Sequence, residues 1–390
     1  MKKTKIFVIT GSRAEYGLLK PLIIRLDKEK RFDMKLIVTG MHLKNFFGNT
    51  IEEIINDGMK IYKKIDILSE KNDNLYESKA LAKGIKKFSK FFIKDRPQLV
   101  VLLGDRYEIF SCAISAYLLN IPIAHIHGGE VTSGAFDEGI RHSITKMSTF
   151  HFTSTEKYKR RVIQLGENPE TVFNVGGLFL DSIDMEKLSS FQEIKNKTKI
   201  KFQKKNILVT YHPLTLERFS NDQSFVNLLK VLNKHTDINV IFTSPNADPG
   251  NNEILDLIYS FVKKNPKRSV LFRSLGHQLY ISLLQFVDAI VGNSSSGITE
   301  APAFKIGTIN IGDRQNGRIM PDSIINCQGN FSSINLAFEK LYSLEFKNKL
   351  KDIHNPYGNG DAASNIIKIL KQISFLKSSQ KFFYDIDTND

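Results

Sequence analysis

Hydrophobic residues in the first half of the chain follow two alternating patterns. Short runs rich in Val, Ile and Phe occupy residues 5–10, 34–40, 99–104, 121–127, 150–155 and 172–177. Between them, residues 18–28, 75–93, 107–119 and 138–148 carry apolar side chains at helical spacing. Strands alternating with amphipathic helices are typical of βα units, whose helices cover both faces of a parallel sheet. The first half therefore predicts a doubly wound α/β domain.

The second half repeats this pattern after a lysine- and serine-rich passage, residues 187–206, which we expect to be an exposed connection. Expected strands occupy 206–213, 238–246, 269–275, 289–297 and 307–312, with helices at 224–235, 276–287 and 361–376. The predicted fold class is α/β, with two doubly wound Rossmann-like domains facing a cleft. The predicted domains are 1–185 and 200–375, with the option that the C-terminal helix packs back on the first.

The composition is that of a globular protein without a membrane-spanning segment. At 390 residues, the chain is long enough for two domains, and 41% hydrophobic with 25% charged residues is typical of a globular protein. No apolar stretch approaches the ~20 residues that span a bilayer, and the sequence begins directly with strand-like residues. We expect a cytoplasmic protein with no membrane partner.

The cysteine content and the distribution of charge argue against cysteine-based sites and against nucleic-acid binding. Cys112 and Cys327 are the only cysteines and belong to different predicted domains, which gives no support for a disulfide framework or a cysteine metal site. The formal net charge is +14, but the lysines are scattered and lack an aromatic-interleaved stripe. We therefore expect no nucleic-acid partner, and a small anionic substrate remains an option.

Ligands of doubly wound sheets bind beyond the carboxyl ends of the strands, so the residues there are the first candidates. After the expected strands stand Arg13 in GSRAEYG, His42 in TGMH, and Asp105 with Arg106 in GDRYE. GSRAEYG is neither a dinucleotide nor a Walker loop. Arg13 could face an anion or be an ordinary surface arginine, and Asp105 could act in a site or cap a helix.

The densest cluster of titratable groups follows the strand at 121–127, in HIHGGEVTSGAFDEGIRHSITK. His125 and His127 are two residues apart and are expected to share a strand face. A zinc site lacks the HExxH spacing, so we expect no metal. Crowded carboxylates at Asp105, Glu130 and Asp137 would instead have separated pKa values, one donating and another accepting a proton.

The second half contains an anion-binding signal in GNSSSGITE, residues 292–300. Small hydroxyl residues and glycines between a strand and a helix provide donors for a diphosphate, and Glu300 could accept from ribose hydroxyls. A helix cap without a ligand is the alternative. Further candidates are the side chains of His212, Asn246, Asn293, Ser294, Ser295, Arg314 and Arg318.

These motifs together resemble the hydrolysing UDP-N-acetylglucosamine 2-epimerases of bacterial sialic and legionaminic acid biosynthesis. The resemblance covers nearly the whole chain through TGSRAEYG, VTGMH, LGDRYE, HIHGGE, RVIQLGE, GNSSSG and INIGDRQNGR. It implies a glycosyltransferase-B-like fold, a nucleotide held mainly by the C-terminal domain, and a sugar between the domains. Relatives are commonly dimers or tetramers, so it also implies a homo-oligomer.

By the same resemblance, Asp105, Glu130, Asp137 and His212 match catalytic or substrate-contacting positions. Substrate contacts are expected from Arg13, His42, Arg106, His127, Asn246, Asn293, Ser294, Ser295 and Glu300, and from Arg314 or Arg318. His127 stands where some relatives have glutamate. The implied reaction releases UDP and N-acetylmannosamine from UDP-N-acetylglucosamine, through 2-acetamidoglucal and its hydration, and needs no cofactor.

Two alternatives remain open from the sequence. One is the variant that acts on UDP-2,4-diacetamido-2,4,6-trideoxyglucose in legionaminic acid biosynthesis. The other is a UDP-sugar glycosyltransferase, which would share the fold and the nucleotide site but would need an acceptor.

Overall fold

The computed structural model describes residues 3–45, 48, 50–68, 75–131, 137–183, 185–212, 223–245, 251–373 and 381–386. The chain divides into two compact units. Unit 1 comprises Met1–Ser182 and Tyr357–Asp390, and unit 2 comprises Ile183–Pro356. Among the described helices, none is long and apolar enough to cross a membrane.

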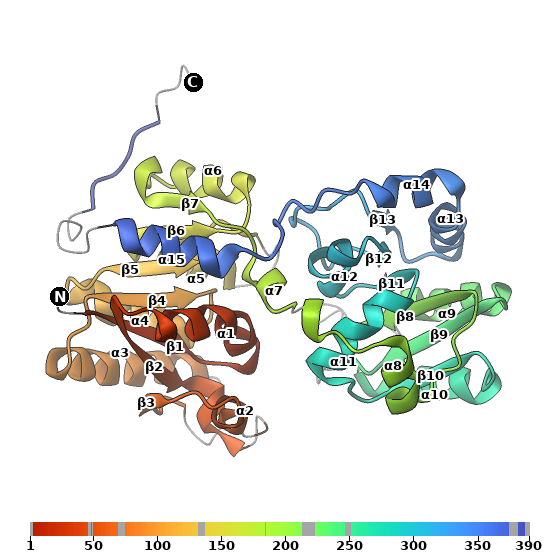
Figure 1. The fold of residues 1–390 in the computed structure, drawn as a ribbon, viewed down its shortest axis with the longest axis horizontal. Helices are drawn as coiled ribbons and strands as arrows, with labels where there is room; N and C mark the ends of the chain where they lie inside the picture. The colour runs from red at the N-terminus through yellow and green to blue at the C-terminus, as the bar shows by residue number, and fades with distance from the viewer. Residues whose placement is uncertain are drawn as a thin grey trace. The chain divides into compact units, whose positions relative to one another are not determined.

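Unit 1 is built around a parallel sheet of seven strands, in the order β3-β2-β1-β4-β5-β6-β7 (Figure 1). The strands are β1 Thr4–Thr10, β2 Phe32–Thr39, β3 Ile61–Ile65, β4 Leu99–Leu103, β5 Ile123–Ile126, β6 Phe150–Thr153 and β7 Val172–Asn174. The order reverses between β1 and β4, which is where ligands of doubly wound sheets bind.

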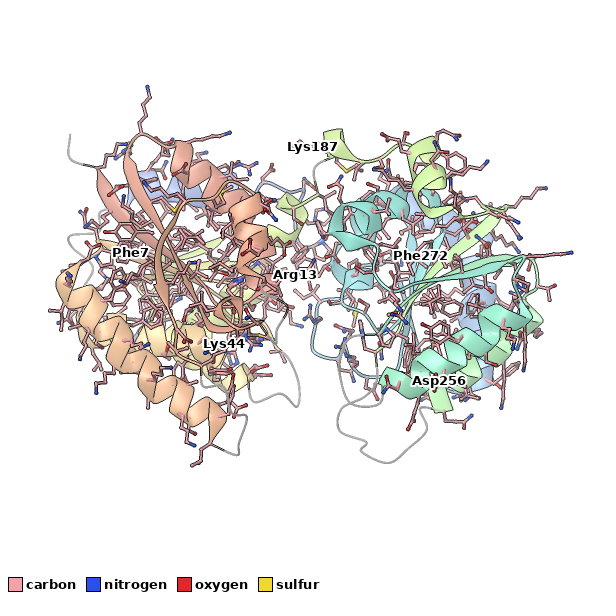
Figure 2. The ribbon with its side chains drawn as sticks, turned by 90° about the horizontal axis from the view of Figure 1, so that it is seen from below. Phe7, Arg13, Lys44, Lys187, Asp256 and Phe272 are labelled. Carbon is pink, nitrogen blue, oxygen red and sulfur yellow. The ribbon has the colours of Figure 1, made fainter. Side chains whose placement is uncertain are left out.

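Helices cover both faces of the unit 1 sheet. They are α1 Arg13–Lys28, α2 Ile51–Asn56, α3 Tyr76–Lys94, α4 Tyr107–Leu118, α5 Asp137–Met147, α6 Glu156–Gln164, α7 Leu178–Asp181 and α15 Ala362–Gln372. Ile6 and Val8 of β1 pack in one core with α1 and α15. Phe7, labelled in Figure 2, belongs to the opposite core and stacks on Phe91 of α3 at 5.3 Å between ring centroids. Alternation along β1 thus fills two cores, as expected of a strand buried on both faces.

Unit 2 has a parallel sheet of six strands in the order β10-β9-β8-β11-β12-β13, which reverses between β8 and β11. The strands are β8 Lys205–Thr210, β9 Ile238–Thr243, β10 Ser269–Phe272, β11 Ala289–Gly292, β12 Gly307–Ile311 and β13 Ile324–Cys327. The helices are α8 Phe191–Thr198, α9 Gln223–Lys234, α10 Asn251–Lys264, α11 Gly276–Leu283, α12 Ser296–Thr299, α13 Phe331–Leu341 and α14 Leu344–Lys351. Two doubly wound sheets are therefore present, as predicted.

The passage at residues 187–206 is largely exposed, as its composition predicts, but it belongs to unit 2 and does not connect the two units. Ser190 and Glu193 form a capping box that starts α8. Ile194 and Ile200 are buried in a core of unit 2. The unit boundary consequently lies before this passage, after Ser182.

The end of the chain belongs to unit 1. Helix α15, blue in Figure 1, packs in the same core as α1. Asp181 of α7 accepts hydrogen bonds from the amides of Ala362 and Ala363, both at 2.9 Å. These amides have no partner within their own helix, so Asp181 satisfies them from a distant part of the sequence. The second predicted domain, which ended at residue 375, ends at Pro356 in the structure.

Beyond α15, Lys381 is anchored in a buried network of unit 1. Its Nζ lies 2.6 Å from Glu167 Oε2. The same carboxylate contacts His151 Nε2 at 2.9 Å and Lys146 Nζ at 2.7 Å. Burial alone would raise the pKa of Glu167, but the hydrogen bonds from His151, Lys146 and Lys381 lower it to about 2.

Glu167→Gln is expected to destabilise the protein by about 1.5–3 kcal/mol, because it removes the negative charge that accepts hydrogen bonds from the half-buried Lys381 ammonium and from buried His151. The lowered pKa means that the carboxylate stabilises the wild type above pH 4.5, and that this contribution is lost as the pH falls toward 2. Urea unfolding at several pH values measures both effects. Exposed Glu170→Gln should change stability by less than about 0.5 kcal/mol; an equal loss in both variants would contradict the prediction.

Candidate active site

The loops after β1 and β4 bring together four predicted site residues of unit 1. Arg13 begins α1, and its Nε lies 3.0 Å from exposed Glu53 (Figure 2). His42 lies in the 3-10 helix η1 (Gly40–Leu43) after β2, and the amide of Met41 in that helix donates to the Gly11 carbonyl at 2.8 Å. Asp105 and Arg106 follow β4. The carboxyl edge of the sheet thus carries them, as the parallel topology predicts.

Arg141 of α5 connects two of the predicted catalytic residues. Its Nη2 forms a short ion pair with Asp105, and its Nη1 donates to the Glu130 carbonyl oxygen at 2.8 Å. The Arg141 side chain is almost completely buried. A buried guanidinium paired with a carboxylate and a carbonyl fixes both partners firmly. Arg141 therefore holds the loops after β4 and β5 together, a role that the sequence prediction did not assign to it.

The Glu130 carboxylate is oriented by two neighbours. Ser154, after β6, donates to Glu130 Oε1 at 2.8 Å. His127 Nδ1 lies 3.5 Å from the same oxygen. These two contacts fix the orientation of the Glu130 carboxylate through Oε1.

His125 and His127 do not share a face, contrary to the prediction. Strand β5 ends at Ile126, and His127 adopts a left-handed conformation with φ 64°. His125 lies in the core, with Nε2 2.8 Å from the Gly104 carbonyl, and burial lowers its pKa to about 3. His127 instead lies beside Phe179 and accepts from the Leu178 amide through Nε2 at 3.4 Å. The two-residue period fails because the extended backbone ends between them.

The glycine pair before Glu130 is explained by packing within unit 1. Gly129 has φ 77°, and a Cβ there would lie 2.5 Å from the Tyr158 carbonyl of α6. Glycine at position 129 therefore allows the backbone of α6 to approach closely.

Asp137, the first residue of α5, has a different environment from Glu130. Burial and then the charge of Asp105 raise the pKa of Asp137. A carboxyl whose pKa is raised in this way is suited to hold a proton. The predicted separation of roles among the carboxylates therefore has a physical basis in unit 1.

His42 is fully buried, with both ring nitrogens bound by protein hydroxyls. Nε2 lies 3.0 Å from Thr10 Oγ1, and Nδ1 lies 2.8 Å from Thr50 Oγ1. Burial lowers the pKa of His42 to about 4, so the ring is neutral at pH 7. The predicted substrate contact by His42 remains a prediction.

In unit 2, Asn293 joins the ends of β8 and β11 at the point where the strand order reverses. Its Oδ1 accepts from the His212 amide and its Nδ2 donates to the His212 carbonyl, both at 2.8 Å. Gly292 makes this approach possible, since it has φ 140° and a Cβ would lie 2.1 Å from the Thr210 carbonyl. Two predicted site residues, His212 and Asn293, are thus held together.

The serine-rich segment, residues 292–300, forms less helix than its sequence predicts. Helix α12 has only four residues and continues into the 3-10 helix η6 (Ala301–Phe304), which contains Pro302. A helix dipole therefore adds little here, and anion binding would depend on hydroxyl and amide groups. Ser294 and Ser295 are half-buried before α12, and Glu300 forms a short hydrogen bond with Thr299.

The loop after β12 contributes cationic and amide groups to the same end of unit 2. Arg314 Nη1 and Gln315 Nε2 donate to the Asn293 carbonyl at 3.1 and 2.9 Å. Arg318 follows in the same loop. Asn246 and Asp248 lie outside the described residues.

Several residues of these sites were not identified from the sequence: Glu15, Ser154, Tyr280 and Gln315. Glu15 carried a signal, because Ser12 and Glu15 have capping-box spacing, and Glu15 donates its amide to Ser12 Oγ at 3.4 Å. The others depend on tertiary contacts, such as the hydrogen bond of 2.8 Å from Tyr280 to Ser296. Among the described residues, no group of three or more His, Cys, Asp and Glu is arranged to hold a metal ion.

Comparison with known proteins gives several curated relatives over the whole chain. A Campylobacter jejuni protein named GDP/UDP-N,N'-diacetylbacillosamine 2-epimerase (hydrolyzing) is 41% identical, covering 99% of this chain and 100% of its own. The Escherichia coli polysialic acid biosynthesis protein P7 is 39% identical, with coverages of 98% and 97%. A Legionella pneumophila UDP-N,N'-diacetylbacillosamine 2-epimerase (hydrolyzing) is 35% identical, with coverages of 95% and 96%.

Among solved structures, the UDP-GlcNAc 2-epimerase from Neisseria meningitidis, bound to UDP-GlcNAc, is similar with a TM-score of 0.82. It is 19% identical and covers 95% of this chain and 100% of its own. This likeness confirms the predicted glycosyltransferase-B-like fold class. The profile of the family described as UDP-N-acetylglucosamine 2-epimerase matches residues 24–371. This chain therefore belongs to the UDP-N-acetylglucosamine 2-epimerase family of enzymes.

Proposed function

We propose that the protein is a hydrolysing 2-epimerase of a UDP-linked 2-acetamido sugar. Family membership supports the reaction class. The observation that carries the proposal is the set of three carboxylates, Asp105, Glu130 and Asp137, beyond the strands of unit 1. Epimerisation needs one group to remove a proton from C2 and another to return a proton to the opposite face.

The proposed reaction begins with departure of UDP, because the C2 proton has no adjacent carbonyl to acidify it. The bond from C1 to the UDP oxygen breaks, and the hydroxyls of Ser294 and Ser295, with Arg314 and His212, stabilise the leaving diphosphate. A carboxylate then takes the C2 proton, which yields a 2-acetamidoglycal. Water adds across the double bond, with hydroxide ending on C1 and a proton entering C2 from the other face.

The two proton-transfer roles are assigned by environment. Glu130, oriented by the hydrogen bond from Ser154, is proposed as the base. Asp137 has a raised pKa, caused by burial and the charge of Asp105, and is proposed as the acid. Asp105 is committed to its ion pair with Arg141 and is proposed to orient the site.

For the substrate, we propose the UDP-linked N,N'-diacetylbacillosamine. Two relatives, at 41% and 35% identity over nearly the whole chain, are named for that sugar. The second candidate is UDP-N-acetylglucosamine, supported by 30% identity, over 98% of this chain, to a Neisseria meningitidis protein named UDP-N-acetylglucosamine 2-epimerase. Both sugars carry the 2-acetamido group that the proposed reaction needs.

Incubation of the purified protein with each nucleotide sugar, without any acceptor, tests the proposal. We expect UDP release and a free 2-epimerised sugar, identified by NMR and mass, with kcat/KM at least ~10-fold higher for the diacetyl sugar, a ratio that corresponds to about 1.4 kcal/mol. A higher kcat/KM for UDP-N-acetylglucosamine would select the second candidate. Turnover only after addition of an acceptor would indicate a glycosyltransferase instead.

A further inference from the structure

Two carboxyl side chains, Glu15 and Glu108, are buried beside a single guanidinium in unit 1. Glu15 is 5% exposed and Glu108 is fully buried. Arg106 donates to both oxygens of Glu108, from Nε at 3.2 Å and from Nη2 at 3.1 Å. A Cβ at Gly11 would lie 3.3 Å from both Glu108 Cβ and Glu15 Oε2. The two carboxyl side chains therefore flank the same turn after β1.

The hydrogen bonds of Glu15 fit a neutral acid better than a carboxylate. Oε2 accepts from the Gly11 amide at 2.7 Å. Oε1 is buried and has no hydrogen-bond partner within the part of the chain that the structure describes. An ionised carboxylate buried in this way would need a counter-charge, and the guanidinium of Arg106 is already bound through two nitrogens to Glu108.

The neighbouring carboxylates outweigh the one guanidinium in their effect on the pKa of Glu15. Glu108 on α4 and Asp105 before α4 oppose its ionisation, and only Arg106 favours it. The neighbouring helix η1 contributes His42, whose buried ring is neutral at pH 7. Burial, followed by the charge of Glu108, raises the pKa of Glu15 to about 8.

We propose that Glu15 is a positioning residue of the active site: as a neutral acid, it fixes the turn that leads to Arg13 and leaves Arg106 bound to Glu108. This inference rests on the proposed function and on the predicted substrate contacts of Arg13 and Arg106. Ionisation of Glu15 places a second carboxylate next to that of Glu108, with one guanidinium between the two. Repulsion then displaces the turn and Arg106, so substrate binding weakens.

Glu15→Gln and Glu15→Ala separate this role from simple packing. Glutamine keeps the shape, the neutrality and an acceptor for the Gly11 amide, whereas alanine leaves that amide without a partner. We expect Glu15→Ala to lower kcat/KM at least ~10-fold at pH 7. In Glu15→Gln, kcat/KM should stay within about threefold of the wild-type value. The wild-type KM should rise, with kcat nearly constant, as the pH passes about 8, and Glu15→Gln should lack this rise. An unchanged alkaline rise in Glu15→Gln would overturn the inference.

An infrared difference spectrum tests the same inference without substrate. Wild type minus Glu15→Gln should show the C=O band of a protonated carboxylic acid at pH 7, and the band should disappear by pH 9.5. The matched variant Glu77→Gln, which removes an exposed carboxylate, should show no such band. Absence of the band from the Glu15 difference spectrum at pH 7 would overturn the inference. If the band is present and neither nucleotide sugar is hydrolysed, the proposed function fails while the neutral state of Glu15 stands.

Discussion

Glu130→Gln and Asp137→Asn are each expected to lower kcat for UDP release by at least ~10²-fold, while UDP affinity stays within about twofold. An amide can neither take up nor give the proton that changes sides at C2. Glutamine at position 130 can still accept from Ser154, which now donates to Glu130 Oε1, so the local structure should persist. Steady-state release of UDP and calorimetric titration with UDP measure the two quantities.

Glu156→Gln provides the matched control, because Glu156 is exposed in the first turn of α6. Its kcat should equal that of the wild type. Wild-type turnover in Glu130→Gln or Asp137→Asn would remove that residue from the proposed mechanism. A parallel loss of UDP affinity would indicate instead that the variant disturbs the fold.

Asn293→Ala is expected to lower UDP affinity at least ~10-fold and to destabilise the protein by about 2–4 kcal/mol. The substitution removes both hydrogen bonds that the Asn293 side chain makes with the amide and carbonyl of His212. The segment after β8 would lose its side-chain link to the end of β11, from which the serine-rich segment continues. Calorimetric titration with UDP and urea unfolding measure these effects.

Asn196→Ala is the control for this loss, since Asn196 is an exposed residue of α8. We expect it to change stability by less than about 0.5 kcal/mol and to leave UDP affinity unaltered. Wild-type UDP affinity in Asn293→Ala would show that the junction between β8 and β11 does not support the nucleotide site.

The sequence predicts the central strands of both sheets and the edge strands β7 and β10, and it misses the edge strands β3 and β13. Strand β1 is apolar on both faces, because each face packs in a core. In contrast, β3 has three exposed residues in a row, and β13 has only one buried residue. An edge strand with little burial has neither a continuous apolar run nor a clear alternation. Helix α8 was also missed from the sequence. It is short, and lysines lie close to its buried residue Ile194, so no helical spacing of apolar residues is evident.

The position of a candidate site residue can be predicted from the sequence only where the order of the strands alone determines it. Asp105 and Asn293 follow central parallel strands, and the carboxyl edge of each sheet receives them. The ion pair of Arg141 with Asp105 joins residues 36 positions apart, and no local pattern encodes that contact. The same limit applies to His127, because the residue at which β5 ends depends on neighbouring strands and not on its own alternation.

Because residues 357–373 belong to unit 1, this unit can complete its fold only after unit 2 has been translated. The ribosome delivers α15 only after every residue of unit 2 has been synthesised, yet α15 covers apolar residues of the first sheet. Until then the nascent first unit exposes part of its core, which makes it a substrate for chaperones and prone to aggregation. A premature stop near residue 357 would therefore damage the amino-terminal half of the protein more than the half in which translation ended.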